Sequence, residues 1–111
     1  MDVNIRTEQN VEIIELKGEV DLYNSPLLRE HFFTLIKAKR PIVLVNLKGV
    51  TYIDSSGLAT LIEAMQKMSK YGGRLCLAGL SRHVRDIFEV SRLENVFTIF
   101  SHEAEALESL K

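Results

Sequence analysis

Several features are scarce or missing in this 111-residue chain, and each absence excludes a class of protein. Cys76 is the single cysteine, so no internal disulfide can form and an intracellular protein is the simpler interpretation. The first residues carry neither a basic flank nor a long apolar stretch, which argues against a standard signal peptide. No segment approaches the roughly 20 apolar residues that a membrane-spanning helix needs. We therefore expect a soluble, cytoplasmic protein with no membrane partner.

Charge of one sign is not in excess either. Lys and Arg number 14 and Asp and Glu number 15, which gives a formal net charge of -1. A protein that binds nucleic acid needs a basic surface, so direct nucleic-acid binding is disfavoured. The hydrophobic content of 46% is typical of globular proteins, and we expect residues 1–111 to form one domain.

The motifs that announce cofactor chemistry are also missing. Neither G-x-x-x-x-G-K-[ST] nor G-x-G-x-x-G occurs, so a dedicated nucleotide-binding fold is unsupported. The histidines His31, His83 and His102 lie in separate segments without a ligand spacing, and we expect them on the surfaces of amphipathic helices. We therefore expect no metal and no cofactor. Cys76 lies in an apolar run, where it is best explained as a small core residue.

Runs of apolar and β-branched residues predict five strands. The first two should form a hairpin through a turn at Gln9-Asn10, and residues 18–21 should leave the second strand. The third run is apolar without interruption, which is typical of a strand buried on both faces. The expected strands are 2–7, 11–17, 42–45, 74–78 and 96–100.

Helical spacing of apolar residues predicts four helices, each starting near a residue that can cap it. Expected caps are Ser25, which precedes Pro26, then the stretch around Ser55, then Ser81 and Ser101. The first helix should end near Lys39, and Gly72-Gly73 should end the second. In the second helix, the expected outer face comprises Thr60, Glu63, Lys67 and Lys70. In the last, the expected inward residues are Ala104, Leu107 and Leu110.

This order of elements predicts an α/β fold. Two opening strands followed by helix–strand alternation imply a mixed, mostly parallel central sheet of about four to five strands, with about four helices packed against it. Turns that follow parallel strands gather at the carboxyl edge of a sheet, which is where ligands bind in such folds. We expect Asp54-Ser55-Ser56 at that edge.

The stretch Tyr52–Leu58 concentrates the unusual chemistry of the chain, and its residues permit more than helix capping. A nucleophilic serine is disfavoured because the G-x-S-x-G elbow is missing and no base is assigned, which leaves a small hydrolase as a weak enzymatic alternative. Asp54 could accept phosphate as in receiver domains, but the acidic doublet that would hold Mg²⁺ is lacking. Asp21 could have a structural role in a turn and no functional role.

Three stretches, 18–21, 42–47 and 50–58, resemble in their order and separation the STAS domain of bacterial anti-sigma factor antagonists. The likeness covers nearly the whole chain and implies a STAS-like fold and a switch that is not an enzyme. It implies an anti-sigma factor with serine kinase activity as the partner. The unphosphorylated protein would bind this anti-sigma factor and thereby free a sigma factor. It implies phosphorylation on Ser55, and a PP2C-type phosphatase that restores the active state.

The same resemblance implies which residues meet the partner. The family's acidic residue near the acceptor corresponds to Asp21, and the helix beginning at Ser56 would carry part of the docking surface. The expected partner-binding residues are Asp21, Tyr23, Asn24, Asp54, Ser56, Gly57 and Thr60. An adaptor subunit of a transporter or signalling assembly, with the same fold and no phosphorylation, is the alternative from another functional class.

Overall fold

The computed structural model describes residues 1–110, which form one five-stranded sheet and four helices. The strands are β1 (Asp2–Glu8), β2 (Val11–Val20), β3 (Ile42–Ile53), β4 (Arg74–Ala78) and β5 (Thr98–Phe100). The helices are α1 (Ser25–Lys37), α2 (Ser55–Ser69), α3 (Arg82–Val90) and α4 (Glu103–Leu110). The strand order is β1-β2-β3-β4-β5, antiparallel between β1 and β2 and parallel elsewhere. The predicted mixed, mostly parallel sheet is confirmed.

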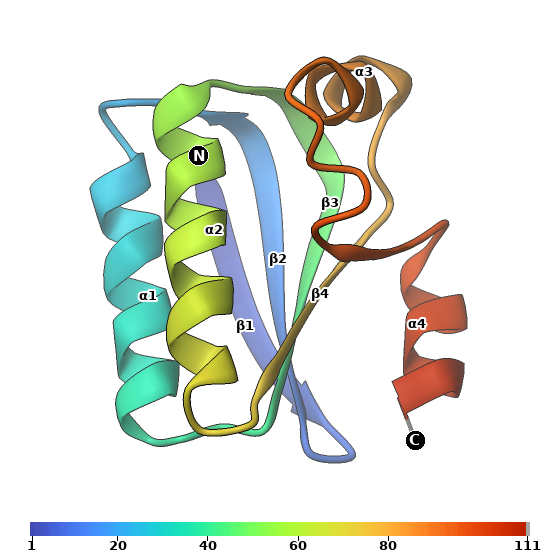
Figure 1. Ribbon diagram of the computed structural model, residues 1–111. Helices are drawn as coiled ribbons and strands as arrows, with labels where there is room; N and C mark the ends of the chain where they lie inside the picture. The colour runs from blue at the N-terminus through green and yellow to red at the C-terminus, as the bar shows by residue number, and fades with distance from the viewer. Residues whose placement is uncertain (111) are drawn as a thin grey trace.

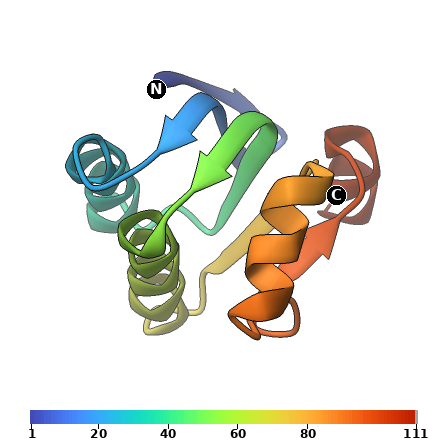
Figure 2. The same cartoon turned by 90° about the horizontal axis from the view of Figure 1, so that it is seen from above.

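The helices cover the two faces of the sheet unequally (Figures 1 and 2). α1, α2 and α3 pack against one face, where Leu28, Leu61 and Phe88 join the main core. α4 packs alone on the other face and buries a smaller cluster that includes Cys76 and Leu110. Burial raises the pKa of the Cys76 thiol, which therefore stays protonated at neutral pH, as expected of a core residue. No helix within residues 1–110 is long and apolar enough to cross a membrane.

The two central strands are longer than predicted. β3 does not end after Val45 but continues to Ile53, and β2 continues through residues 18–20, which were expected to leave the sheet. The pairing of β2 with β3 is irregular twice, after Glu15 and after Gly18, and Gly18 has a φ of +95°. Such bulges let a strand bend without ending, and they interrupt the residue pattern by which strands are recognised in a sequence. β5, in contrast, begins only at Thr98.

Two of the predicted helix caps are wrong by one residue. The N-cap of α1 is Asn24, not Ser25, and its side chain turns back into the preceding loop. At α4, the imidazole Nδ1 of His102 accepts a hydrogen bond from the Glu105 N–H at 3.2 Å, the role expected of Ser101. The cap of α3 is confirmed, since the hydroxyl of Ser81 accepts from the Val84 N–H.

Two predicted helix faces also need correction. Thr60 was expected on the outer face of α2, but its side chain is 8% exposed. Its hydroxyl donates to the Ser56 carbonyl at 2.9 Å, which removes the need for contact with water. In α4 the inward residue of the first turns is the buried Ala106, whereas Ala104 is exposed.

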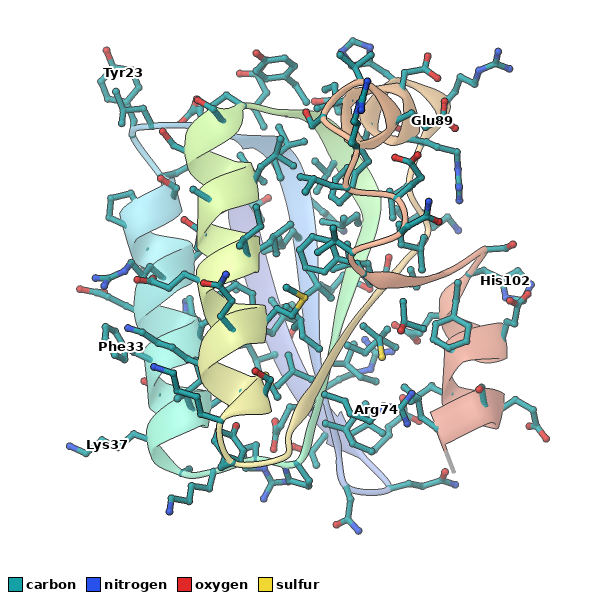
Figure 3. All side chains as sticks on the ribbon, viewed as in Figure 1. Tyr23, Phe33, Lys37, Arg74, Glu89 and His102 are labelled. Atoms are coloured by element: carbon teal, nitrogen blue, oxygen red, sulfur yellow. The ribbon has the colours of Figure 1, made fainter. Side chains whose placement is uncertain are left out.

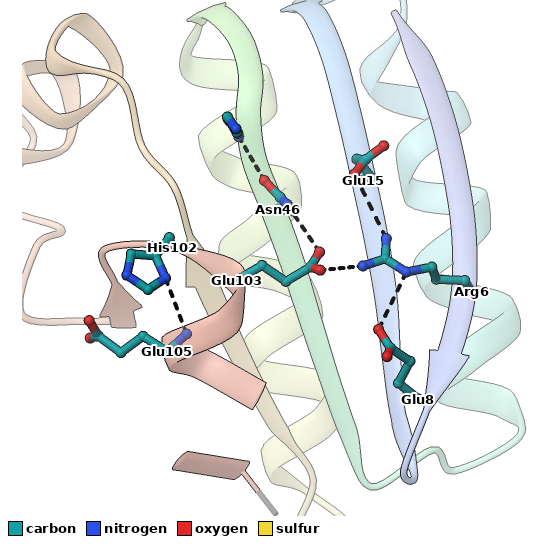
Figure 4. A network of polar contacts seen from close by, with 8 residues as sticks. Arg6, Glu8, Glu15, Asn46, His102, Glu103 and Glu105 are labelled. Carbon is teal, nitrogen blue, oxygen red and sulfur yellow. Dashed lines mark hydrogen bonds and ion pairs between the residues drawn. The ribbon is translucent and has the colours of Figure 1, made fainter. Parts of the chain in front are cut away.

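Polar contacts attach the first turn of α4 to the sheet (Figure 4). The Glu103 carboxylate accepts from the Asn46 amide at 3.1 Å and pairs with Arg6, which reaches across β2 from β1. Arg6 also lies 3.8 Å from Glu15. The Asn46 side-chain oxygen accepts from the Lys48 N–H at 2.9 Å, so this amide, buried in the centre of the sheet, is satisfied at both ends.

Candidate functional site

The turn between β3 and α2 carries the stretch that stood out in the sequence. Asp54 is the N-cap of α2, and its Oδ1 accepts from the Gly57 N–H at 3.0 Å. α2 therefore begins at Ser55, directly beyond the carboxyl end of the central strand. In Figure 1 this start lies at the top edge of the molecule, level with the β2–α1 turn and with α3. The predicted location of Asp54-Ser55-Ser56 is confirmed.

Asp54 also ties this turn to the β2–α1 turn. Its Oδ2 accepts from the Leu22 N–H at 3.0 Å, and its own N–H donates to the Val20 carbonyl at 3.0 Å. Each carboxylate oxygen thus holds one turn. Because a helix cap and an interturn bridge share one side chain, the start of α2 is fixed relative to β2.

The β2–α1 turn is held by its own side chains. The Oδ1 of Asp21 accepts from the N–H groups of Tyr23 at 3.0 Å and Asn24 at 3.1 Å. The Asn24 amide accepts from the Asp21 N–H at 2.8 Å and donates to the Glu19 carbonyl at 2.8 Å. The turn role considered for Asp21 is confirmed. One oxygen of that carboxylate serves the turn, and the residue remains half-buried.

Gly57 is required by close packing. A Cβ at this position would lie 2.6 Å from Ile53 Cγ1 and 2.9 Å from Val20 Cγ1, well inside contact distance. The absence of a side chain lets the first turn of α2 rest directly on the ends of β2 and β3. Gly57 and Thr60 are both buried, so they support the surface from beneath.

The two serines differ in their surroundings. Ser55 is exposed, and among residues 1–110 no group hydrogen-bonds its hydroxyl. Ser56 is half-buried, and its hydroxyl also has no hydrogen-bond partner among residues 1–110, so exposure is what separates the two serines. The hydroxyl more open to another molecule is that of Ser55, at the amino end of a helix where backbone N–H groups favour negative charge.

Large apolar side chains are exposed in the β2–α1 turn and at the end of β3, and the sequence did not single out all of them. Tyr23 is 92% exposed, Leu22 is 64% exposed, and Tyr52 is also exposed. Figure 3 shows Tyr23 projecting from the top edge. Leu22 was missed because a lone leucine in a turn has no periodicity to mark it. Clustered exposed apolar side chains of this kind mark interaction sites more often than chance exposure does.

The β2–α1 and β3–α2 turns carry charge of one sign. Neither 18–28 nor 49–62 contains Lys or Arg, whereas Glu19, Asp21 and Asp54 carry carboxylates. Within the described residues no group of three or more His, Cys, Asp or Glu side chains is arranged to hold a metal ion. The site is an acidic turn that presents the exposed Ser55 hydroxyl without a hydrogen-bond partner among residues 1–110.

Comparison with known proteins gives consistent results. A family model described as the STAS domain matches residues 2–106. The chain is 32% identical over 101 residues to the anti-sigma-B factor antagonist of Bacillus subtilis (strain 168), which covers 89% of this chain and 92% of that protein.

Solved structures share the fold. SpoIIAA, an anti-sigma factor antagonist, matches in its unphosphorylated form with a TM-score of 0.84 at 23% identity, over 98% of this chain and 96% of that one. The structure of Bacillus SpoIIAA in its phosphorylated form matches with a TM-score of 0.78 at 22% identity, over 99% of this chain and 100% of that one. A sulfate transporter family protein from Wolinella succinogenes matches with a TM-score of 0.76 at 19% identity, over 94% and 87%.

Proposed function

This chain belongs to the STAS domain family, and from that premise we propose that it is an anti-sigma factor antagonist switched by phosphorylation of Ser55. Unphosphorylated, it binds an anti-sigma factor that is also a serine kinase and so releases a sigma factor. The kinase transfers phosphate to Ser55 and the complex separates. A PP2C-type phosphatase removes the phosphate again. The chain itself catalyses no step.

The observation that carries this proposal is the state of the Ser55 hydroxyl. It is exposed and free of hydrogen bonds, yet it sits on a turn that Asp54 fixes to two elements. A kinase needs an accessible hydroxyl, and a switch needs that hydroxyl at a defined position in an interface. The likeness to a relative named as an anti-sigma-B factor antagonist adds support.

Electrostatics support release at the interface over unfolding of the chain. Phosphoserine adds about -1.5 to -2 charges at neutral pH. The N–H groups at the start of α2 can accept part of that charge, so the fold tolerates it. Asp54 and Asp21 already make the surroundings acidic, and a partner matched to the neutral hydroxyl would then face a buried, unpaired dianion.

We propose three roles for the expected partner-binding residues. Asp21, Tyr23 and Ser56 have surface that a partner can touch, and Asn24 and Asp54 hold the two turns together. Gly57 and Thr60 act indirectly, by setting how closely α2 approaches the strands and where its first turn lies.

Isothermal titration calorimetry of Ser55 variants tests the proposal. Each serine kinase anti-sigma factor of the source organism would be purified and titrated in turn with ADP present. Ser55→Ala is expected to bind at least as tightly as the unmodified chain, and Ser55→Asp at least tenfold more weakly. The matched control is Ser69→Ala, because Ser69 is an exposed serine at the far end of α2. Equal affinity of Ser55→Asp and the unmodified chain would refute the switch.

The second candidate is an adaptor role in a transporter or signalling assembly without phosphorylation. The observation that supports this candidate is the fold that the chain shares with the sulfate transporter family protein. Phosphosite mass spectrometry of the chain isolated from its native cells separates the two. Full absence of phosphate on Ser55, under conditions that both activate and silence the pathway, would favour the adaptor.

A further inference from the structure

The acceptor surface is too small to account for a stable complex. Specific protein interfaces bury about 800 Å² on each partner and involve roughly 20 residues a side. Of the residues expected to meet the partner, Gly57 and Thr60 are buried, and the Asn24 amide is engaged within its turn. A partner seated on Ser55 must therefore cover further surface along the same edge.

The outer side of α3 supplies exposed apolar surface on that edge. His83, Ile87 and Val90 follow one another at i, i+4 and i+7, so they form one stripe along the helix, in which Ile87 is half-buried and also packs against the main core. Val90 is 85% exposed, which is unusual for a β-branched apolar side chain. The stripe borders a hollow of about 240 Å³ lined by His83, Asp86, Ile87, Val90 and Ser91. Val84 and Phe88, on the inner side, already anchor the helix in the core.

The stripe is continuous with the acceptor surface. The rings of Tyr52 and His83 are stacked, with centroids 6.1 Å apart and planes inclined by 26°. Tyr52 lies two residues before Asp54, at the end of β3. In Figure 3 the top edge runs from Tyr23 at one end to α3, marked by Glu89, at the other. The Tyr52–His83 pair bridges the two parts.

In the opposite direction, along α1, Leu27 is 46% exposed and the exposed aromatic ring already has cation contacts within the chain. Phe33 is the exposed aromatic residue there, and two cations lie over its ring: Arg29 at 4.9 Å and Lys67 at 4.4 Å from the ring centroid. The Phe33 ring therefore already has cation–π partners within the chain. Val90 on α3 has no such contact within residues 1–110 and remains 85% exposed.

We propose that the anti-sigma factor that docks at Ser55 also covers the stripe of Tyr52, His83, Ile87 and Val90, the α3 stripe, with apolar side chains of its own. The inference rests on the proposed function and adds a second contact region to it. Phosphorylation would act on the acceptor half of the interface, and the α3 stripe would supply affinity that does not depend on the phosphate.

Calorimetric titration of Val90→Ser and Val96→Ser against the same anti-sigma factor tests this inference. Val96 is a matched control because it is an exposed valine, 45% exposed, in the loop after α3 and outside the stripe. Burying one valine side chain contributes enough that Val90→Ser should weaken binding by about tenfold. Val96→Ser should leave the affinity within about twofold of the unmodified chain, and circular dichroism should show both variants folded.

The other possible results separate a failure of this inference from a failure of the proposed function. If Val90→Ser binds normally while Ser55→Asp binds weakly, the α3 stripe is not covered and only this inference is overturned. If Val90→Ser alters the sedimentation of the free chain but not its affinity for the anti-sigma factor, the stripe covers a second copy of the chain, and the inference is likewise overturned. If the unmodified chain binds no anti-sigma factor, the proposed function fails and this inference with it.

Discussion

At the scale of single residues, Asp54 and Asp21 organise the surface around Ser55 by accepting backbone hydrogen bonds. Asp54 accepts one from each turn, and Asp21 accepts two within its own turn. Their charges therefore have structural partners, which means that a loss of function after mutation has two explanations. Substitutions that keep the hydrogen bonds but remove the charge separate them.

Asp21 offers the sharper comparison. Asp21→Asn keeps a side-chain oxygen for the N–H groups of Tyr23 and Asn24, so the midpoint of urea unfolding should stay almost unchanged. Asp21→Ala loses both bonds and should lower the free energy of unfolding by about 1 kcal/mol. If the charge meets the partner, both variants bind the anti-sigma factor more weakly. If Asp21→Asn binds normally and Asp21→Ala does not, the residue serves the turn alone.

Residue types were predicted better than residue roles. The sequence pointed to a cap at each helix start, but Asn24 and His102 were passed over for the neighbouring serines. Several side chains in such turns can accept an N–H hydrogen bond, and the choice depends on the path of the chain from the preceding strand. Thr60 was misplaced for a related reason, since a polar side chain can bond its own helix and be buried.

At the scale of elements, α1 and α2 are joined on their outer side by a charged cluster. The Glu63 carboxylate accepts from Arg29 Nε at 2.6 Å and lies 3.6 Å from Lys67 Nζ, and both cations lie over the Phe33 ring. The hydrogen bond from Arg29 lowers the pKa of the Glu63 carboxyl below its usual range. The cluster is exposed, so its contribution to stability is small and screened by salt.

The lowered pKa of Glu63 predicts a dependence on pH. A carboxyl whose pKa is lower in the folded than in the unfolded chain stabilises the fold above its unfolded pKa, about 4.3 for Glu. That stabilisation is lost as the pH falls through the folded pKa. Thermal unfolding should therefore show the unmodified chain more stable than Glu63→Gln at pH 6, with the gap narrowing below about pH 4. A gap that does not change between pH 6 and pH 3 would contradict the assignment.

The existence and order of the elements were predictable, but some of their ends were not. Periodicity identified β4 with both of its ends, because that strand is short, apolar and regular. It cut β2 and β3 short, because bulges after Glu15 and Gly18 shift the pairing and bring polar residues and glycine into the strands. Long-range pairing keeps such segments extended where local sequence does not.

At the scale of the whole molecule, the sheet places the two turns that matter side by side. β2 and β3 are parallel neighbours, so residues 20–24 and 54–57 meet at one edge although about thirty residues separate them. The alternation of strands and helices predicted the place of Asp54-Ser55-Ser56 at that edge, and the family resemblance alone implied that Asp21 lies near them. The position of α4 alone on the other face was not, since Arg6, Asn46 and Glu103, which attach it, come from three distant segments.

The same view explains how a phosphate could regulate binding without altering the fold. Ser55 stands outside both cores, and its hydroxyl holds nothing in place within residues 1–110. Adding a phosphate there changes the charge of the edge while leaving the contacts of Asp54 and Gly57 available. In the proposed switch, the fold supports the site while one side chain changes.

The central claim is that Ser55 accepts phosphate from the anti-sigma factor, and phosphosite mapping after incubation with that kinase and ATP tests it most directly. The account predicts one phosphate per chain, located on Ser55 by fragmentation mass spectrometry, and no incorporation into Ser55→Ala. Phosphate on Ser56 or elsewhere in the unmodified chain, or full incorporation into Ser55→Ala, would contradict it.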